Sequence, residues 1–316
     1  MNKWISILAG LLAVQLVLAL TLNMARDDYA AFKPQGQLLT FDKQQVDGLQ
    51  ITAGKESIKL KKKDGKWLLP ASDNFPASQA SVAKLIDKLA AMKKGWPVAT
   101  TRNAAKHFKV AEDKFERKLT LYSNNKTVAE LLVGSSPGFR KVHVRPTGED
   151  AIYAVTLNSW ELNAKPDDWI DKSILALKEE TVKRIEMADF VLQRKDGKLQ
   201  IENPGKTEET NQAQVKTLLH KLAGMTIQSL LGQKAKAEYQ QEKQALAFKV
   251  VLKDGRNLDY HFFKPDKSAY YVLQRSDFKE YFKVADFIVD PFKDITRKKL
   301  VQPHKEEAAA KEVPKE

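Results

Sequence analysis

The tripeptide Gly205-Lys206-Thr207, within the stretch "NPGKTEET", has the residue types of a phosphate-binding loop. Such a loop needs a further glycine five positions before the second one, so that its backbone N–H groups can surround the phosphate. Gln200 occupies that position. We therefore expect this stretch to be an ordinary turn and the chain to bind no nucleotide cofactor.

Cysteines, histidines and clustered carboxylates are the other side chains able to do chemistry. The chain has no cysteine, which excludes disulfides, thiolate metal sites, a cysteine nucleophile and a lipidated cysteine. Its histidines are scattered, with no zinc-binding pair one helical turn apart: His107, His143, His220, His261 and His304. Asp167, Asp168 and Asp171 lie where a loop meets a helical segment, a place that favours acidic residues without any catalysis. We predict no catalytic, cofactor-binding or metal-binding residue, although carboxylates from distant positions can still pair in the folded chain.

Basic residues are the strongest remaining signal, because the formal net charge of +13 attracts anionic lipid or acidic wall polymer. Lys59, Lys61 and Lys63 alternate along a predicted strand and therefore share one face. They are a candidate anion-binding edge, or they belong to an exposed edge strand whose charges discourage pairing with other chains. We favour the second interpretation. Aromatic residues that would stack on bases are not interleaved with them, so nucleic acid is not an expected partner.

The N-terminal segment from Ile5 to Leu22 carries no charge over 18 residues. A helix of that length spans roughly 27 Å, close to the hydrocarbon thickness of a bilayer. A cleaved signal peptide has a shorter apolar region and small residues at its cleavage site. We therefore predict an uncleaved single-pass anchor, with the N-terminus in the cytoplasm and the body outside it. The predicted anchor residues are Ile5, Leu8, Leu11, Leu12, Leu16, Val17 and Leu20.

The tetrapeptide KDGK occurs twice and indicates how the rest of the chain is organised. Asp64-Gly65 and Asp196-Gly197 each separate two strand-like runs, which is typical of a tight hairpin. An apolar stripe of helical period follows each hairpin, and the two stripes are 133 residues apart. The stripes are Val82, Leu85, Ile86, Leu89 and Met92, and Val215, Leu218, Leu219, Leu222 and Met225. The sequence therefore predicts that one hairpin and helix plan is used twice.

Further strand pairs follow each predicted helix, around Asn124-Asn125 and around Asp254-Gly255, and each half then ends on a short helical segment. We expect an α+β fold in which a transmembrane helix precedes two duplicated domains, each an antiparallel sheet with one long packed helix. The expected boundaries are an anchor at 1–25, a linker at 26–43, a first repeat at 44–177, a second at 178–302 and a disordered charged tail at 303–316.

The motif "DGKW" before a helix, together with "PDDWIDKSIL" at the end of the first half, resembles the uncharacterised bacterial family DUF4340. The likeness extends from about Val46 to Val301, and the order of elements carries it. The second half departs from the pattern, because Leu199 stands where the first half has Trp67. The resemblance implies a single-pass protein of the bacterial inner membrane with its body in the periplasm, of a kind often encoded beside an ABC exporter and a gliding-motility-like auxiliary subunit. It implies no activity and no catalytic residue.

These observations together favour a non-enzymatic, membrane-anchored envelope protein. We expect a bilobed interaction module that is accessory to an ABC-type transport complex, with inner-membrane proteins such as ABC transporter subunits as its partners. Two alternatives stay open. One is an envelope hydrolase with its site between the two repeats, and the other is a module that binds anionic lipid or wall polymer in a salt-sensitive way.

Overall fold

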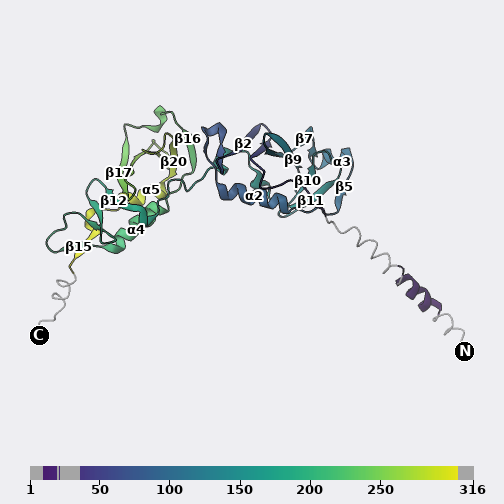
Figure 1. Cartoon of the computed structure of the whole chain (residues 1–316), viewed down its shortest axis with the longest axis horizontal. Helices are drawn as coiled ribbons and strands as arrows, with labels where there is room; N and C mark the ends of the chain where they lie inside the picture. Colours follow the sequence, from purple (N-terminus) through teal and green to yellow (C-terminus); the bar gives the residue numbers. More distant parts are fainter. Residues whose placement is uncertain (1–9, 20, 22–35, 305–316) are drawn as a thin grey trace. The chain divides into compact units, whose positions relative to one another are not determined.

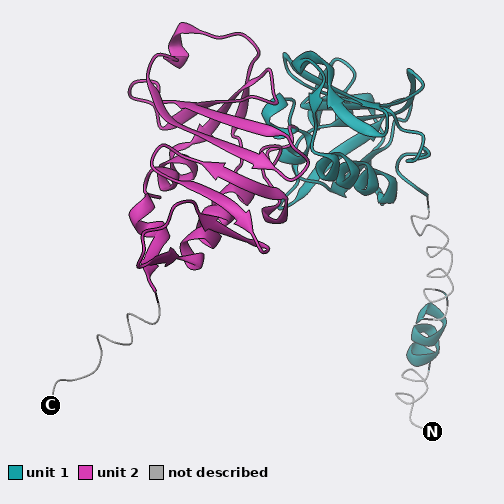
Figure 2. Cartoon of the chain, turned by 60° about the vertical axis from the view of Figure 1, so that its left-hand side comes forward, with its two compact units in different colours: residues 1–169 teal, residues 170–316 magenta. Residues whose placement is uncertain are grey.

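The computed structural model of the chain describes residues 10–19, 21 and 36–304. The chain divides into two compact units, residues 1–169 (unit 1) and 170–316 (unit 2), which are drawn in different colours in Figure 2. Each unit contains a large antiparallel sheet and few helices. The predicted α+β class is therefore confirmed.

The predicted membrane anchor is only partly covered by the structure. Residues 10–19 are helical, and the side chains of Leu11, Leu12, Leu16 and Val17 are 55–60% exposed. Ile5, Leu8 and Leu20 lie outside the described residues. Among the residues that are described, no helix has the length and apolar character needed to cross a membrane.

Unit 1 is built on a nine-stranded sheet with the order β4-β3-β2-β1-β8-β9-β10-β11-β5 (Figure 1). Its strands are β1 Gly48–Ala53, β2 Glu56–Lys63, β3 Lys66–Leu69, β4 Phe75–Pro76, β5 Pro97–Ala99, β8 Arg117–Ser123, β9 Lys126–Val133, β10 Lys141–Pro146 and β11 Ile152–Thr156. Its helices are α2 Gln79–Ala91 and α3 Arg102–His107, with short 3-10 turns η1 Pro70–Ser72, η2 Ser159–Leu162 and η3 Pro166–Asp168. A small hairpin, β6 Val110–Ala111 and β7 Lys114–Phe115, completes the unit.

Helix α2 forms where the apolar stripe predicts it. The Ser78 side chain caps its first turn by accepting a hydrogen bond from the Ser81 N–H. The stripe residues Val82, Leu85, Ile86 and Leu89 are buried. Asp64 and Gly65 adopt positive φ angles of 50° and 77°, as the predicted hairpin between β2 and β3 requires. Local signals therefore account for this helix and for the hairpin before it.

A glutamine side chain joins α2 to the end of the first hairpin. The Gln79 amide accepts a hydrogen bond from the Trp67 N–H at 2.8 Å and donates one to the Trp67 carbonyl at 2.9 Å. In unit 2 the amide of Gln212 donates to the Leu199 carbonyl at 3.0 Å. Each glutamine is the first residue of its helix, so in both units the helix start is held to the strand after the KDGK turn.

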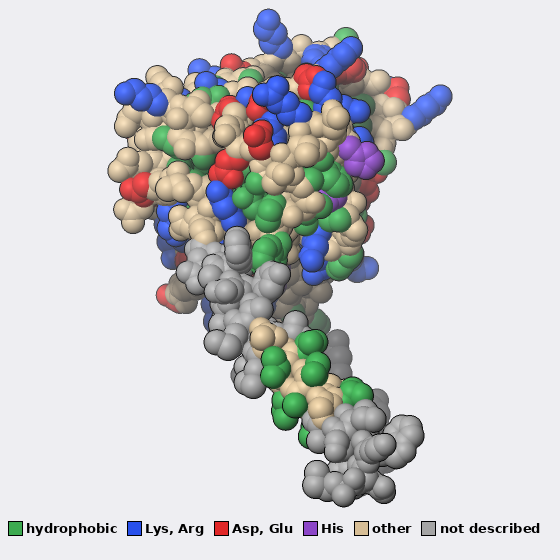
Figure 3. Space-filling model, turned by 90° about the vertical axis from the view of Figure 1, so that its right-hand side faces the viewer, with side chains coloured by type: hydrophobic (Ala, Val, Ile, Leu, Met, Phe, Trp, Pro, Cys, Tyr) green, Lys and Arg blue, Asp and Glu red, His purple; other side chains and the backbone are tan. Residues whose placement is uncertain are grey.

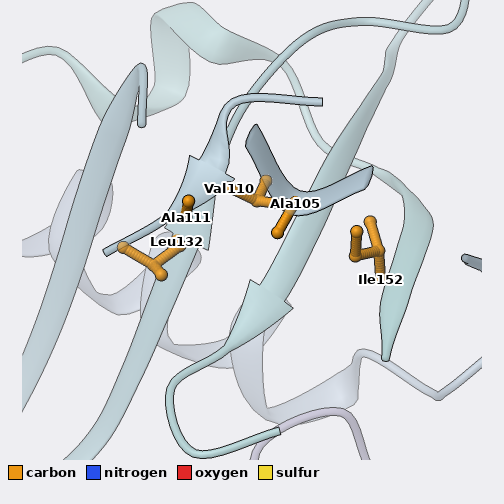
Figure 4. Close-up of a cluster of buried hydrophobic side chains, with 5 residues drawn as sticks. All are labelled: Ala105, Val110, Ala111, Leu132 and Ile152. Atoms are coloured by element: carbon orange, nitrogen blue, oxygen red, sulfur yellow. The ribbon is translucent and has the colours of Figure 1, made fainter. Parts of the chain in front are cut away.

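Helix α3 covers a small apolar cluster near the β5 end of unit 1. The cluster consists of Ala105, Val110, Ala111, Leu132 and Ile152, which Figure 4 draws as sticks. These residues come from α3, the β6-β7 hairpin and strands β9 and β11. The cluster therefore holds two short elements against the sheet.

Unit 2 is built on an eight-stranded sheet with the order β14-β13-β12-β17-β18-β19-β20-β16. Its strands are β12 Val182–Glu186, β13 Val191–Lys195, β14 Lys198–Ile201, β16 Ser229–Gly232, β17 Gln244–Leu252, β18 Asn257–Phe263, β19 Tyr270–Arg275 and β20 Tyr281–Ala285. The helices are α4 Gln212–Ala223, α5 Asp286–Lys293 and α6 Arg297–Leu300, with 3-10 turns η4 Glu179–Thr181 and η5 Ala237–Tyr239. A separate pair, β15 Glu208–Thr210 and β21 Val301–Pro303, lies at the end of the unit.

The two sheets share one arrangement of elements. Three consecutive antiparallel strands of the sheet precede the long helix in unit 2, and four do so in unit 1, where the two-residue strand β4 is added. A run of four consecutive strands, β8 to β11 or β17 to β20, follows in each sheet. The short strand after the helix, β5 or β16, pairs antiparallel with the last strand of its sheet. That short edge strand is absent from the sequence prediction.

The predicted linker and the predicted tail both contain residues that belong to the folded units. Leu38 and Leu39 fall in the predicted linker and are only 2% and 5% exposed. Val301 to Pro303 form β21, so the predicted tail starts on a paired strand. Residues 305–316 lie outside the described residues.

Candidate functional site

The Gly205-Lys206-Thr207 stretch forms a turn in which the glycine amide faces a carboxylate. The Gly205 N–H donates to the Glu208 carboxylate at 2.9 Å, and Arg297 pairs with the same carboxylate at 2.7 Å. A phosphate-binding loop would instead aim its amides at open space. The turn therefore has a structural role within unit 2.

The histidines have separate neighbours. His143 is buried, its ring packs at a tilt against Phe108 with ring centroids 4.2 Å apart, and it lies 3.1 Å from the Ser135 hydroxyl. His220 lies 2.8 Å from a carboxylate oxygen of Glu179. Across residues 10–19, 21 and 36–304, no group of three or more metal-binding side chains comes together.

The lysines of β2 lie on an exposed face and not along an edge. Strand β2 has β1 on one side and β3 on the other, so the edge-strand interpretation of Lys59, Lys61 and Lys63 is wrong. All three side chains are exposed, and the Lys59 ammonium lies 5.3 Å from the centre of the Tyr122 ring. Sequence periodicity gives the shared face correctly, but it cannot give the neighbours of the strand.

The acidic segment contributes to a pocket on unit 1, which we call the Trp160 pocket. It has a volume of about 270 Å³ and lies between the first turns of α2, the turn η2 and the chain that follows it. Its lining consists of Ser81, Lys84, Leu85, Trp160, Glu161, Asn163, Asp168 and Trp169. Of the three predicted acidic residues, only Asp168 lines it, whereas Asp171 accepts hydrogen bonds from the N–H and hydroxyl of Ser173.

The "PDDW" segment is fixed to α2 by its tryptophan. Trp169 is 4% exposed, its indole N–H donates to the Asn163 carbonyl at 2.8 Å, and its own carbonyl accepts from the Ser78 N–H at 2.7 Å. Since Ser78 is the N-cap of α2, the segment and the helix start form one wall. The tryptophan of the motif is thus a positioning residue for the pocket.

Glu161 is held on the opposite wall. Its carboxylate accepts hydrogen bonds from the Lys88 ammonium at 2.7 and 2.8 Å, and from the backbone N–H of Asn158 at 3.0 Å. These contacts join η2 to the middle of α2. Trp160, the residue before Glu161, is 65% exposed.

A family model described as "Domain of unknown function (DUF4340)" matches residues 67–244, more than half of the chain. The chain belongs to the DUF4340 family. The match begins at Trp67 of the "DGKW" motif and includes every residue that lines the Trp160 pocket. No curated protein and no solved structure matches the chain.

The part of the chain outside the DUF4340 match presents a second exposed aromatic in the corresponding place. Phe287 lies on the short helix α5 that ends the sheet of unit 2, as Trp160 lies on η2 after the sheet of unit 1. Phe287 is 77% exposed. The residues that face inward beside these aromatics, Leu157 and Leu162 in unit 1 and Val284 and Val289 in unit 2, are fully buried.

The arrangement suits binding. An exposed tryptophan offers a large rigid apolar surface, and Lys84, Asn163 and Asp168 add polar groups around it. Sequence reasoning missed Trp160 and Phe287, because the fold decides whether an aromatic side chain is buried or exposed. Each of the two lies between two apolar residues that point into the core, in a short segment at the end of its sheet. A large aromatic at such a position, where a polar residue is expected, is the signal that could have identified them.

Protonation of Glu161 is expected to weaken unit 1 in acid. Burial acts to raise the pKa of this carboxyl, but hydrogen bonds from Lys88 and Asn158 outweigh it and leave the pKa below its ordinary value of 4.5. The stabilising contribution is therefore complete above about pH 4.5 and is lost as the pH falls through the lower folded-state pKa. Urea unfolding at a series of pH values should show a flatter acid limb for Glu161→Gln. Glu56→Gln, at an exposed position, is the control, and equal acid limbs for both variants would contradict the assignment.

Proposed function

We propose that this DUF4340 protein is a non-enzymatic, membrane-anchored envelope protein whose two units bind subunits of an ABC-type transport complex. One observation carries the proposal: each unit exposes a large aromatic side chain from the short helical segment that ends its sheet. Exposed Trp and Phe anchors are typical of protein interfaces, where a few of them supply most of the binding energy. The DUF4340 resemblance to envelope proteins encoded beside exporters supports the choice of partner.

We also propose that the two units arose by duplication of one ancestral unit. The shared order of strands, the paired glutamine contacts of Gln79 and Gln212, and the matching helix stripes support this origin. Duplication would explain why Trp160 and Phe287 stand at corresponding places. A partner with two similar subunits, or two similar segments, would match such a protein.

Anchoring in the inner membrane, with the body on the periplasmic side, is part of the same proposal. The uncharged stretch from Ile5 to Leu22 supports it, because its length matches the hydrocarbon thickness of a bilayer. Resistance of the full chain to alkaline carbonate extraction, combined with protease access to the body from the periplasmic side only, tests this part. Release into the carbonate supernatant would contradict it.

Loss of the two aromatics should release the transport partner. Mild crosslinking in native membranes followed by purification of the full chain should recover transporter subunits with the wild type. A truncated anchor residue costs about 2 kcal/mol or more, which is about 30-fold in affinity. We therefore expect Trp160→Ala and Phe287→Ala each to lower recovery strongly, and the double variant to abolish it.

A matched control is Val128→Ala, which shortens an apolar side chain that is also exposed, at 37%, on β9. Recovery should stay at the wild-type level in this variant. If the double aromatic variant recovers the same subunits as the wild type, or if no transporter subunit is recovered with any form of the chain, the proposed function is wrong.

A further inference from the structure

The N-terminal segment joins unit 1 beside the end of α2. The Lys94 N–H donates to the Gly36 carbonyl at 2.9 Å, and the Leu38 N–H donates to the Met92 carbonyl at 2.8 Å. Gln37 and Lys93 form an isolated antiparallel bridge between the same two stretches. Whatever precedes Gly36 in the chain is therefore attached at this end of the unit, which we call the Gly36 end.

Two exposed aromatic side chains lie at the Gly36 end. Trp96 is 59% exposed and immediately precedes β5, and Phe139 is 85% exposed in the loop that precedes β10. Strand β5 runs antiparallel to β11, and Thr156 at the end of β11 pairs with Lys141 at the start of β10. The start of β5, the end of β11 and the loop before β10 thus lie toward one end of the sheet. Figure 3 shows hydrophobic side chains gathered among lysines and arginines on this side of the unit.

The loop that carries Phe139 is held in place. The Ser136 hydroxyl lies 2.8 Å from the Gly138 carbonyl and 2.6 Å from the Lys141 carbonyl, which closes the loop on itself. The Arg140 guanidinium lies over the Phe139 ring, 4.7 Å from its centre. Because the loop is closed by these contacts, the ring is presented at its tip with little ordering left to occur on binding.

Exposed basic residues lie close in the sequence to the two aromatics. Lys93, Arg140 and Lys141 are exposed, and within residues 36–304 none of them forms an ion pair with a carboxylate. Lys94, Lys106 and Lys109 are instead paired with Glu149, Asp113 and Glu116. The charge that a partner would meet next to Trp96 and Phe139 is therefore positive.

We propose that the Gly36 end of unit 1 rests on the anionic headgroup surface of the membrane, with Trp96 and Phe139 at the level of the headgroups. Tryptophan and other aromatic rings favour that level, and basic residues are attracted to anionic lipid. The proposal rests on the proposed anchoring, because the anchor segment joins the body at this same end. The contact orients the body relative to the bilayer, which a tether alone does not do.

A lipid-depth measurement on the full chain tests the contact. The chain has no cysteine, so a single fluorescent label can be placed by substitution. Gly138→Cys puts the label beside Phe139 at a position where an added Cβ meets nothing within 4 Å. Lys126→Cys is the control, because it is exposed at the start of β9, at the opposite end of that strand from the Phe139 loop.

In vesicles of phosphatidylcholine and phosphatidylglycerol with brominated acyl chains, we expect several-fold stronger quenching of the label at 138 than at 126. Phe139→Ser in the Gly138→Cys background should reduce quenching at 138 to the level of the control. Equal quenching at the two positions, or no quenching at 138, would overturn the proposal. Carbonate extraction of the same vesicles reports on the anchor separately, so failure of the surface contact and failure of the anchor are distinguishable.

The charge requirement has its own matched comparison. Replacing Lys93, Arg140 and Lys141 by Glu should abolish quenching at 138, as should omission of phosphatidylglycerol. Replacing Lys59, Lys61 and Lys63 by Glu changes the net charge equally but on the face of β2, and should leave quenching unchanged. Equal loss with both triple variants would overturn the assignment to the Gly36 end in favour of general attraction to a basic protein.

Capture of a soluble protein through Phe139 with no lipid quenching would identify this surface as a protein interface and would also overturn the proposal.

Discussion

Arg275→Ala should lower the free energy of unfolding of unit 2 by about 2–5 kcal/mol, because it leaves two buried acceptors without their donor at about 1–3 kcal/mol each. Arg275 is 3% exposed. Its guanidinium donates to the Leu175 carbonyl at 2.8 Å and to the Tyr260 hydroxyl at 3.1 Å, and it pairs with Asp277 at 2.7 Å. Truncation leaves that carbonyl and hydroxyl without their charged donor in a region that water does not reach. Asp277 loses its counter-ion at the same time.

Urea unfolding followed by circular dichroism measures the effect, and Arg256→Ala is the matched control. Arg256 also pairs with an aspartate, Asp254, at 2.9 Å, but its side chain is 63% exposed. Exposed pairs contribute about 0–1 kcal/mol, so this variant should unfold close to the wild type. Similar losses of unfolding free energy in the two variants would show that the contribution of Arg275 to stability does not depend on its burial.

Gly134→Ala should destabilise unit 1 by about 1–3 kcal/mol or more, because the added methyl group has no space. A Cβ at Gly134 would lie 2.0 Å from the Phe108 carbonyl oxygen and 2.4 Å from that of Lys109. Both contacts are with backbone, so no side chain can rotate away. The chain after α3 would have to move off β9, which opens the apolar cluster that includes Leu132 (Figure 4).

The control for this variant is Gly95→Ala, where an added Cβ meets no atom within 4 Å and the backbone φ lies outside the positive range. At such a site, alanine changes stability little or raises it by about 0.4–1 kcal/mol through the unfolded chain. Thermal unfolding of the two variants should therefore differ clearly in midpoint. A Gly134→Ala midpoint equal to that of Gly95→Ala would contradict the packing described at the end of α3.

Local signals in the sequence predict the elements well, whereas the sequence does not predict which elements become neighbours. The turn at Asp64-Gly65 and the stripe ending at Leu89 depend on residues close together in the chain. The interior place of β2 depends on its pairing with β1 and β3, and the burial of Leu38 depends on contacts with the end of α2, more than 50 residues away. The edge strand at Pro97–Ala99 is too short for a period to be recognised.

The candidate site shows the same division. In the sequence, the aspartates of the "PDDW" segment are its candidate functional residues. In the structure, Trp169 positions the segment and Trp160 supplies the exposed apolar surface. Exposure of a tryptophan can be predicted only when the buried side of its helix is known. Residue type and spacing therefore indicate where to look, and packing decides which residue meets a partner.

The glutamine that begins each long helix has a consequence for assembly. Strand β14 is the outermost strand of its sheet, and two of its backbone groups are already occupied by side chains: the Leu199 carbonyl by Gln212 and the Ile201 N–H by the Thr210 hydroxyl. An edge strand whose backbone groups are already hydrogen-bonded offers an incoming extended peptide fewer main-chain groups to pair with. Addition of a strand from another chain at the β14 edge is therefore disfavoured, and copies of the chain should not polymerise through this edge.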